Sequence, residues 1–217
     1  MKYTLILFLF LTGCLKSSNI DLQQDQIVTS HFNKREVVQL QQILTFFDNE
    51  VRIIADTNGS LEDSYHVFFK TVKDSALAGN PYGIILRIPS QKLHNLFSSL
   101  SDTVKHELWV TSRYISPLTK DSVADFNIRS GGKYEAFLKS ASGESQTLEK
   151  YYKTFENGPG ITPALVANMV LFAERLNMKR ESDRLIVAVH YLAIRETGEL
   201  RKQLNKPGQK QAHLRKH

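Results

Sequence analysis

Apolar residues recur at intervals of three and four along most of this chain, which is the spacing of one face of an α-helix. The clearest run starts after Asn33, where Glu36 completes the pattern of a capping box. The apolar residues that continue this run are Val37, Leu40, Leu44, Phe47, Val51 and Ile54. Asn58-Gly59 is typical of a helix end, so the pattern predicts a helix between these two signals.

Further helices are predicted by the same combination of caps and spacing. Ser60 and Asp63 start a second helix, which we expect to form an antiparallel hairpin with the first. The remaining predicted helices start near Ser90, Ser101, Tyr134, Thr147, Pro163 and Ser182. The helix from Ser101 is expected to run through Ile115, and the last two helices are expected to form a second hairpin. Residues 84–86 could form a short strand or a buried extended link.

The pattern therefore predicts a mostly all-α domain over residues 33–200, arranged as an irregular helical bundle or as stacked helical hairpins. At most one short strand is expected. Residues 118–133 are weakly patterned and contain Gly131-Gly132, so they are predicted to be a loop. This loop is the best place for a boundary if the domain has two subdomains. The composition, 41% hydrophobic and 23% charged, is typical of a folded domain.

The N-terminal residues have a different character from the rest of the chain. Lys2 supplies one positive charge, residues 4–12 form a short apolar run, and Gly13 precedes Cys14, as in an export signal. The sequence Leu11-Thr12-Gly13-Cys14 resembles the lipobox of bacterial lipoproteins. This resemblance implies cleavage before Cys14, a diacylglycerol on its thiol, and in many members a further acyl chain on the new amine.

The resemblance makes residues 1–13 a signal peptide and residues 14–32 a lipidated cysteine followed by a polar tether. Two or three acyl chains hold a protein at a membrane far better than one. The apolar run is shorter than the roughly 20 residues of a membrane-spanning helix. We therefore expect the lipid on Cys14 to hold the domain at a membrane, facing the periplasm or the cell exterior. Leu15, where Asp would favour the inner membrane in enteric bacteria, favours the outer membrane.

The net charge of +6 belongs to the C-terminal end. Of the 28 Lys and Arg, six lie in residues 201–217, which contain no acid, and one lies in the signal peptide. This leaves 21 bases against the 22 Asp and Glu of the body. We expect residues 201–217 to be a disordered basic tail, and the near-neutral body predicts no nucleic-acid partner. Cys14 is the only cysteine, which excludes a disulfide within the chain and a Cys-based zinc site.

No motif in the sequence predicts a catalytic residue, a metal site or a cofactor. His106-Glu107 matches half of a zinc-protease motif, but Val110 stands where the second histidine is required. His190 lies in an apolar helix, where a satisfied histidine is expected unless a carboxylate is close. Gly131-Gly132-Lys133 lacks the other residues of a phosphate-binding loop.

Three residues form the candidate interaction surface. Trp109 and Arg113 are four residues apart and would share a face of the predicted helix, with Tyr114 beside them. Trp, Tyr and Arg are the residues that most often anchor protein interfaces. The alternative is a partly buried tryptophan beneath the stem of the arginine.

The sequence leaves three functions open. The preferred hypothesis is a non-enzymatic, lipid-anchored envelope protein that binds another macromolecule, a protein or an envelope polymer, as assembly factors and immunity proteins do. This hypothesis predicts an exposed apolar or aromatic patch. An envelope-acting hydrolase would need a pocket where His66, His106 or His190 meets a carboxylate. A small-ligand carrier would need a large apolar cavity between helices.

Overall fold

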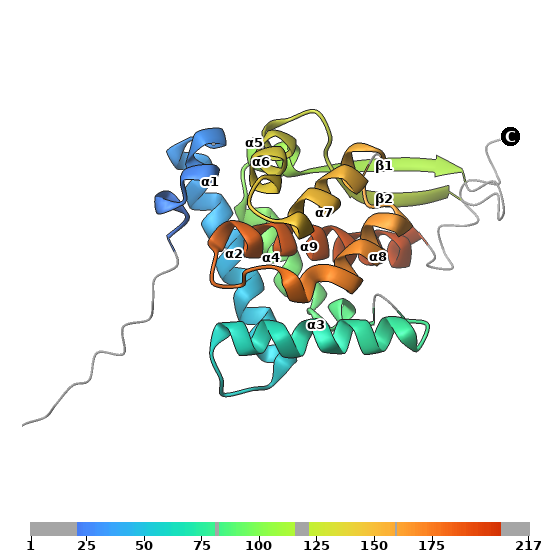
Figure 1. Cartoon of the computed structure of the whole chain (residues 1–217). Helices are drawn as coiled ribbons and strands as arrows, with labels where there is room; N and C mark the ends of the chain where they lie inside the picture. The colour runs from blue at the N-terminus through green and yellow to red at the C-terminus, as the bar shows by residue number, and fades with distance from the viewer. Residues whose placement is uncertain (1–20, 81–82, 116–121, 159, 205–217) are drawn as a thin grey trace, which may run out of the picture.

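The computed structural model describes residues 21–80, 83–115, 122–158 and 160–204 (Figure 1). The chain is mostly helical, as predicted, but its described part also contains a two-stranded antiparallel sheet. The helices are α1 (Gln26–His31), α2 (Lys34–Ala55), α3 (Leu61–Leu77), α4 (Ser90–Ser99), α5 (Asp102–Leu108), α6 (Lys133–Ser142), α7 (Gln146–Glu156), α8 (Pro163–Phe172) and α9 (Glu181–Leu204). The strands are β1 (Trp109–Ile115) and β2 (Ser122–Ile128), and the short 3-10 helices are η1 (Leu22–Gln24), η2 (Ile85–Arg87) and η3 (Ala173–Arg175).

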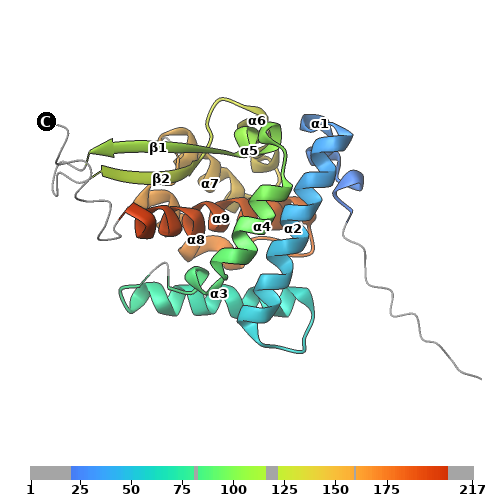
Figure 2. The same cartoon turned by 180° about the vertical axis from the view of Figure 1, so that it is seen from behind.

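Helix α9 runs through the middle of the molecule (Figures 1 and 2). Its residues 182–195 are buried without interruption, as in a helix that is surrounded on all sides. Its main neighbours are β2, α2 and η2. One apolar core extends from Leu22 to Ile194 and includes residues on both sides of 118–133. The subdomain break that was predicted there is therefore not confirmed.

The capping signals at Asn33, Ser60 and Thr162 are confirmed, whereas Ser90 is the first residue of α4, which has no side-chain cap. The Asn33 side chain accepts from the backbone N–H of Glu36 at 3.1 Å, and the Glu36 carboxylate accepts from the backbone N–H of Asn33 at 2.8 Å. Ser60 and Asp63 form the same reciprocal pair at the start of α3. Thr162 caps α8, which begins with a proline. These bonds satisfy backbone donors that a helix start leaves free.

The strands replace a predicted helix and a predicted loop. Helix α5 ends at Leu108, and β1 then pairs with β2 so that Trp109 lies opposite Ile128 and Ile115 opposite Ser122. The predictions of a helix through Ile115 and of at most one strand are wrong, and the predicted loop over 118–133 is wrong at residues 122–128, which form β2. Residues 109–115 are rich in aromatic and β-branched side chains, which favour a pleated strand over a helix. Residues 84–86 do not form the possible strand, because most of them lie in η2.

The arrangement of the helices differs from two regular hairpins. Helices α2 and α3 pack together but cross at a steep angle in both views (Figures 1 and 2). Helix α8 packs mainly against α7 and α3, so its predicted pairing with α9 is not confirmed.

The predicted ends of the domain need correction as well. The fold starts before residue 33, because Leu22, Val28 and Phe32 are buried in the core. The basic segment does not begin as a disordered tail, since α9 continues to Leu204. The predicted signal peptide (1–13), Cys14 and residues 205–217 lie outside the described residues.

Candidate interaction surface on the β1–β2 hairpin

One side of the β1–β2 hairpin carries a mixed apolar and polar surface. Side chains alternate between the two sides of a strand, so one side holds Val110, Ser112 and Tyr114 of β1. Opposite them in the register lie Val123, Asp125 and Asn127 of β2. We call these six residues the hairpin face. Val110 is 45% exposed and Tyr114 is 46% exposed, although both carry large apolar groups.

The other side of the hairpin packs into the core at Trp109, Phe126 and Ile128, and it is exposed at Thr111, Arg113 and Ile115. The Trp109 ring lies edge-on to Phe97 of α4 at 5.2 Å and tilted against Phe126 of β2 at 5.6 Å. Its indole N–H donates to the backbone oxygen of Val189 in α9 at 3.1 Å. Trp109 is only 2% exposed, so it anchors the hairpin to the core and does not reach the surface that was predicted for it.

The end of α9 fixes the outer edge of β2. The Thr197 hydroxyl accepts from the backbone N–H of Phe126 at 2.9 Å and donates to the backbone oxygen of the same residue at 3.0 Å. Four residues later, the Arg201 guanidinium donates to the Asp125 carboxylate at 2.6 and 3.1 Å. Both views show β2 between β1 and α9 (Figures 1 and 2). The hairpin is therefore held on its β2 side.

A cavity of about 140 Å³ lies where the hairpin face meets α9. Asp125 and Asn127 line it from the hairpin, and Thr197 and Arg201 line it from α9. Ile161, from the loop before α8, contributes an apolar wall. Small-molecule sites are usually about 300–1,000 Å³, so this cavity is of the size of a single apolar side chain.

The polar groups around this cavity are already bonded to one another. The Asn127 side chain accepts from the backbone N–H of Ile161 at 3.1 Å and donates to the Ser112 hydroxyl at 3.3 Å. The loop approaches Asn127 closely at Gly160, where an added Cβ would lie 2.8 Å from the Asn127 side chain. Gly160 also has a φ of +72°, which other residues rarely adopt. The polar groups of Asn127 thus already have hydrogen-bond partners within the protein.

Tyr114 is joined to this network by its hydroxyl. The neighbouring Asp125 carboxylate raises the pKa of Tyr114 above its ordinary value. Arg201, which pairs with the same carboxylate, works against that rise in pKa. Tyr114 thus shares the hairpin face with Asp125, which lines the cavity, and its ring is accessible to a partner.

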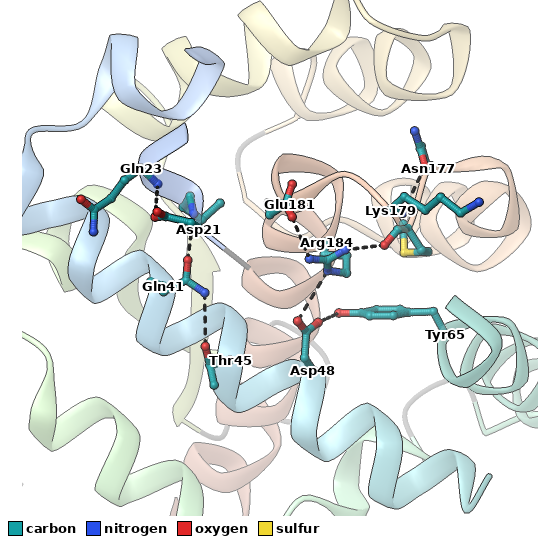
Figure 3. Close-up of polar contacts among 12 residues, drawn as sticks. Asp21, Gln23, Gln41, Thr45, Asp48, Tyr65, Asn177, Lys179, Glu181 and Arg184 are labelled. Atoms are coloured by element: carbon teal, nitrogen blue, oxygen red, sulfur yellow. Dashed lines mark hydrogen bonds and ion pairs between the residues drawn. The ribbon is translucent and has the colours of Figure 1, made fainter. Parts of the chain in front are cut away.

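The most deeply buried polar cluster lies elsewhere, between α2, α3 and α9 (Figure 3). The Tyr65 hydroxyl donates to Asp48 at 2.7 Å, and the Arg184 guanidinium lies 3.5 Å from the other Asp48 oxygen. Burial raises the pKa of Asp48 to about 6, against the opposing effects of Tyr65 and Arg184. None of these residues lines either of the best-formed cavities of the described chain. This cluster joins three helices and offers no access to a substrate.

The three histidines that an enzyme would need are not placed in a polar pocket. His66 and His106 are exposed on α3 and α5. His190 is fully buried, and its Nδ1 lies 3.0 Å from the Tyr151 hydroxyl. Burial lowers the pKa of His190 to about 3 and keeps the ring neutral. None of the three lines either of these two cavities.

The sequence located part of the candidate surface but not its context. Arg113 and Tyr114 are exposed, as an interaction surface requires, whereas Trp109 is not. Because β1 is a strand, Arg113 and Tyr114 point to opposite sides of the hairpin. Val110, Asp125, Asn127 and Thr197 were missed. The alternation of the polar Asp125 and Asn127 with the apolar Ala124, Phe126 and Ile128 was the available signal for the strand.

The comparisons with known proteins identify no relative. No protein-family model matches the chain, and searches of curated proteins and of solved structures return no match. Among the described residues, no helix has the length and apolar character needed to cross a membrane. The same part of the chain holds no group of three or more acidic, histidine or cysteine side chains arranged for a metal ion.

Proposed function

We propose that this chain is a lipid-anchored envelope protein, attached through Cys14, whose helical domain binds another protein through the hairpin face. One observation carries the proposal: Val110 and Tyr114, which are exposed, share the hairpin face with Asp125 and Asn127, and those two residues line a side-chain-sized cavity. Exposed apolar surface next to a pocket is typical of interfaces, because a partner can bury its own apolar anchor there.

The state of the cavity's polar groups supports a binding role over a catalytic one. Asn127 and Thr197 are engaged in hydrogen bonds within the protein, and the Asp125 carboxylate is paired with Arg201. A reacting substrate needs a nucleophile or a general base that is free to act. An incoming apolar side chain needs only the space and the apolar wall that Ile161 and Ile194 provide.

The size of the cavity argues against a small-ligand carrier. A volume of about 140 Å³ is well below that of a typical small-molecule site. The second cavity, beside Tyr151 and Met169, is smaller still, at about 10 Å³. The described residues therefore favour a partner that inserts a single side chain.

The test is capture from membranes with the native lipid anchor in place. Wild type, Tyr114→Ala and Ile53→Ala are purified in mild detergent, and the proteins that accompany each are identified and quantified. Ile53 is a matched control because it is 62% exposed in the last turn of α2, away from the hairpin in both views. A protein that is depleted at least tenfold with Tyr114→Ala and retained with Ile53→Ala supports the proposal. Equal capture by all three overturns it.

A further inference from the structure

The two edges of the hairpin are not equivalent. The outward groups of β2 include the N–H and the oxygen of Phe126, and the Thr197 hydroxyl satisfies both. Phe126 lies opposite Thr111 in the register, so Thr111 belongs to a pair whose backbone groups point away from the partner strand. The bond from the N–H of Arg129 to the oxygen of Leu108, at 2.9 Å, sets the same alternation independently.

It follows that the backbone groups of Thr111 and Arg113 point to the outer edge of β1. Both residues are exposed. No described residue hydrogen-bonds to their backbone groups on that edge, and β2 is the only strand that pairs with β1 in the described chain. A row of outward N–H and C=O groups at strand spacing is complementary to one kind of structure, another extended backbone.

We propose that the outer edge of β1 receives an extended segment of the partner protein, which adds a third strand to the sheet. This inference rests on the proposed function and names how the partner is held. Alternate side chains of the added strand would lie beside Val110 and Tyr114 on the hairpin face, and beside Thr111 and Arg113 on the other side.

The side chains of β1 indicate the chemistry of that segment. Arg113 is the charged residue of β1, and its backbone groups point to the outer edge of the strand. Its side chain therefore selects an acidic side chain beside it in the added strand. Val110 and Tyr114 select apolar ones. A second copy of this chain is a poorer occupant, because an added β1 brings another arginine and no acid, and edge charges of this kind oppose self-pairing.

The test uses two synthetic probes of seven residues with alternating valine and threonine. One carries glutamate at its central position and the other carries lysine. Amide hydrogen exchange of the full-length protein is measured residue by residue with each peptide. At saturation, the glutamate peptide is expected to slow exchange at Thr111 and Arg113 at least tenfold. The Ser112 amide, which faces β2, should change little. No slowing at Thr111 and Arg113 overturns the inference, and equal binding of the two peptides overturns its charge selection.

A pair of variants separates backbone pairing from side-chain contact. Thr111→Pro removes an outward N–H that β2 does not use, and proline is tolerated at such edge positions. Thr111→Val changes the side chain and keeps the N–H. The proline variant is expected to lose at least tenfold in affinity for the glutamate peptide, and the valine variant to bind like wild type. An unchanged affinity of Thr111→Pro for the glutamate peptide overturns the inference. If Thr111→Pro does not fold, the hydrogen exchange of the wild-type protein with the two peptides tests the inference instead.

The same variants distinguish this inference from the proposed function. If Tyr114→Ala loses the captured membrane protein while Thr111→Pro retains it, the hairpin face binds without strand addition, and only the inference fails. If both variants retain it, the proposed function itself fails. If Tyr114→Ala and Thr111→Pro both lose the captured protein and Thr111→Val retains it, the proposed function and the inference are both supported.

Discussion

The hydroxyl of Thr197 lies within 3.0 Å of both backbone groups of Phe126 and makes a hydrogen bond with each. This side chain thus satisfies the outward groups of Phe126 on β2 and, with Arg201, ties the hairpin to α9. The opposite edge, formed by β1, has no such cover among the described residues. The hairpin is therefore held to α9 along β2, and the outer edge of β1 is open among the described residues.

Removing the Thr197 hydroxyl should loosen the hairpin. Thr197→Val keeps the shape of the side chain and leaves two backbone groups of Phe126 without a partner. Leaving buried polar groups unpaired costs about 1–3 kcal/mol, so the free energy of unfolding in urea should fall by that amount. The Phe126 amide should also exchange faster. Thr197→Ser keeps the hydroxyl and should stay within about 0.5 kcal/mol of wild type; an equal loss in both variants would contradict the assigned role.

His190 should make the fold sensitive to acid. Its pKa is lowered from 6.5 to about 3 by burial, so the folded state resists protonation. The neutral His190 ring therefore contributes its full share to the free energy of unfolding above pH 6.5, and this contribution is lost as the pH falls from 6.5 toward 3. Between pH 6 and pH 4, wild type should lose about 2–3 kcal/mol relative to His190→Gln, which does not titrate. Unfolding free energies of both proteins at several pH values check this, and parallel curves would contradict it.

Asp48 should act in the opposite direction. Its pKa is raised from 3.8 to about 6, so the folded state disfavours the charged carboxylate. The cost of that charge is absent well below pH 3.8 and grows as the pH rises from 3.8 to 6. From pH 4 to pH 7, wild type should therefore lose about 2–3 kcal/mol relative to Asp48→Asn.

The Asp48 comparison works because other acids titrate equally in both proteins. At pH 4 the Asp48 carboxyl is protonated in the folded state, so Asp48→Asn leaves the charge around Arg184 unchanged there. The difference between the two proteins at pH 4 therefore serves as the baseline for the change at higher pH. A difference between the two unfolding curves that remains flat from pH 4 to pH 7 would show that Asp48 titrates normally.

Cys14 should be required for membrane attachment. Cys14→Ser removes the thiol that would carry the diacylglycerol, so metabolic labelling with a radioactive fatty acid should be lost and the precursor should keep its full size. Ser17→Ala, three residues further on, should be labelled and processed like wild type. Unchanged labelling and size in Cys14→Ser would exclude the lipid anchor.

The elements that could be predicted from the sequence are those set by local signals. Asn33 with Glu36, and Thr162 with Pro163, mark helix starts through bonds between residues at most three apart, and both are found in the structure. The helix predicted from Ser101 is found as far as Leu108, and the prediction failed beyond it because residues 109–115 favour a strand.

The candidate site could not be assembled from local signals. Thr197 and Phe126 are 71 residues apart in the chain, and nothing in their neighbourhoods indicates that they meet. Tyr114 was correctly expected at the surface, but the cavity beside it exists only because the hairpin, α9 and the loop at Ile161 converge. Contacts of this kind depend on the tertiary fold.

Photo-crosslinking from Tyr114 tests the binding role of the hairpin face most directly. Benzoylphenylalanine is placed at Tyr114 or, as a control, at Ile53 in the full-length, lipidated protein, and the cells that produce it are irradiated. A discrete adduct to one protein from Tyr114, and its absence from Ile53, is the predicted result. No adduct from Tyr114, or the same adducts from both positions, would contradict a partner on the hairpin face.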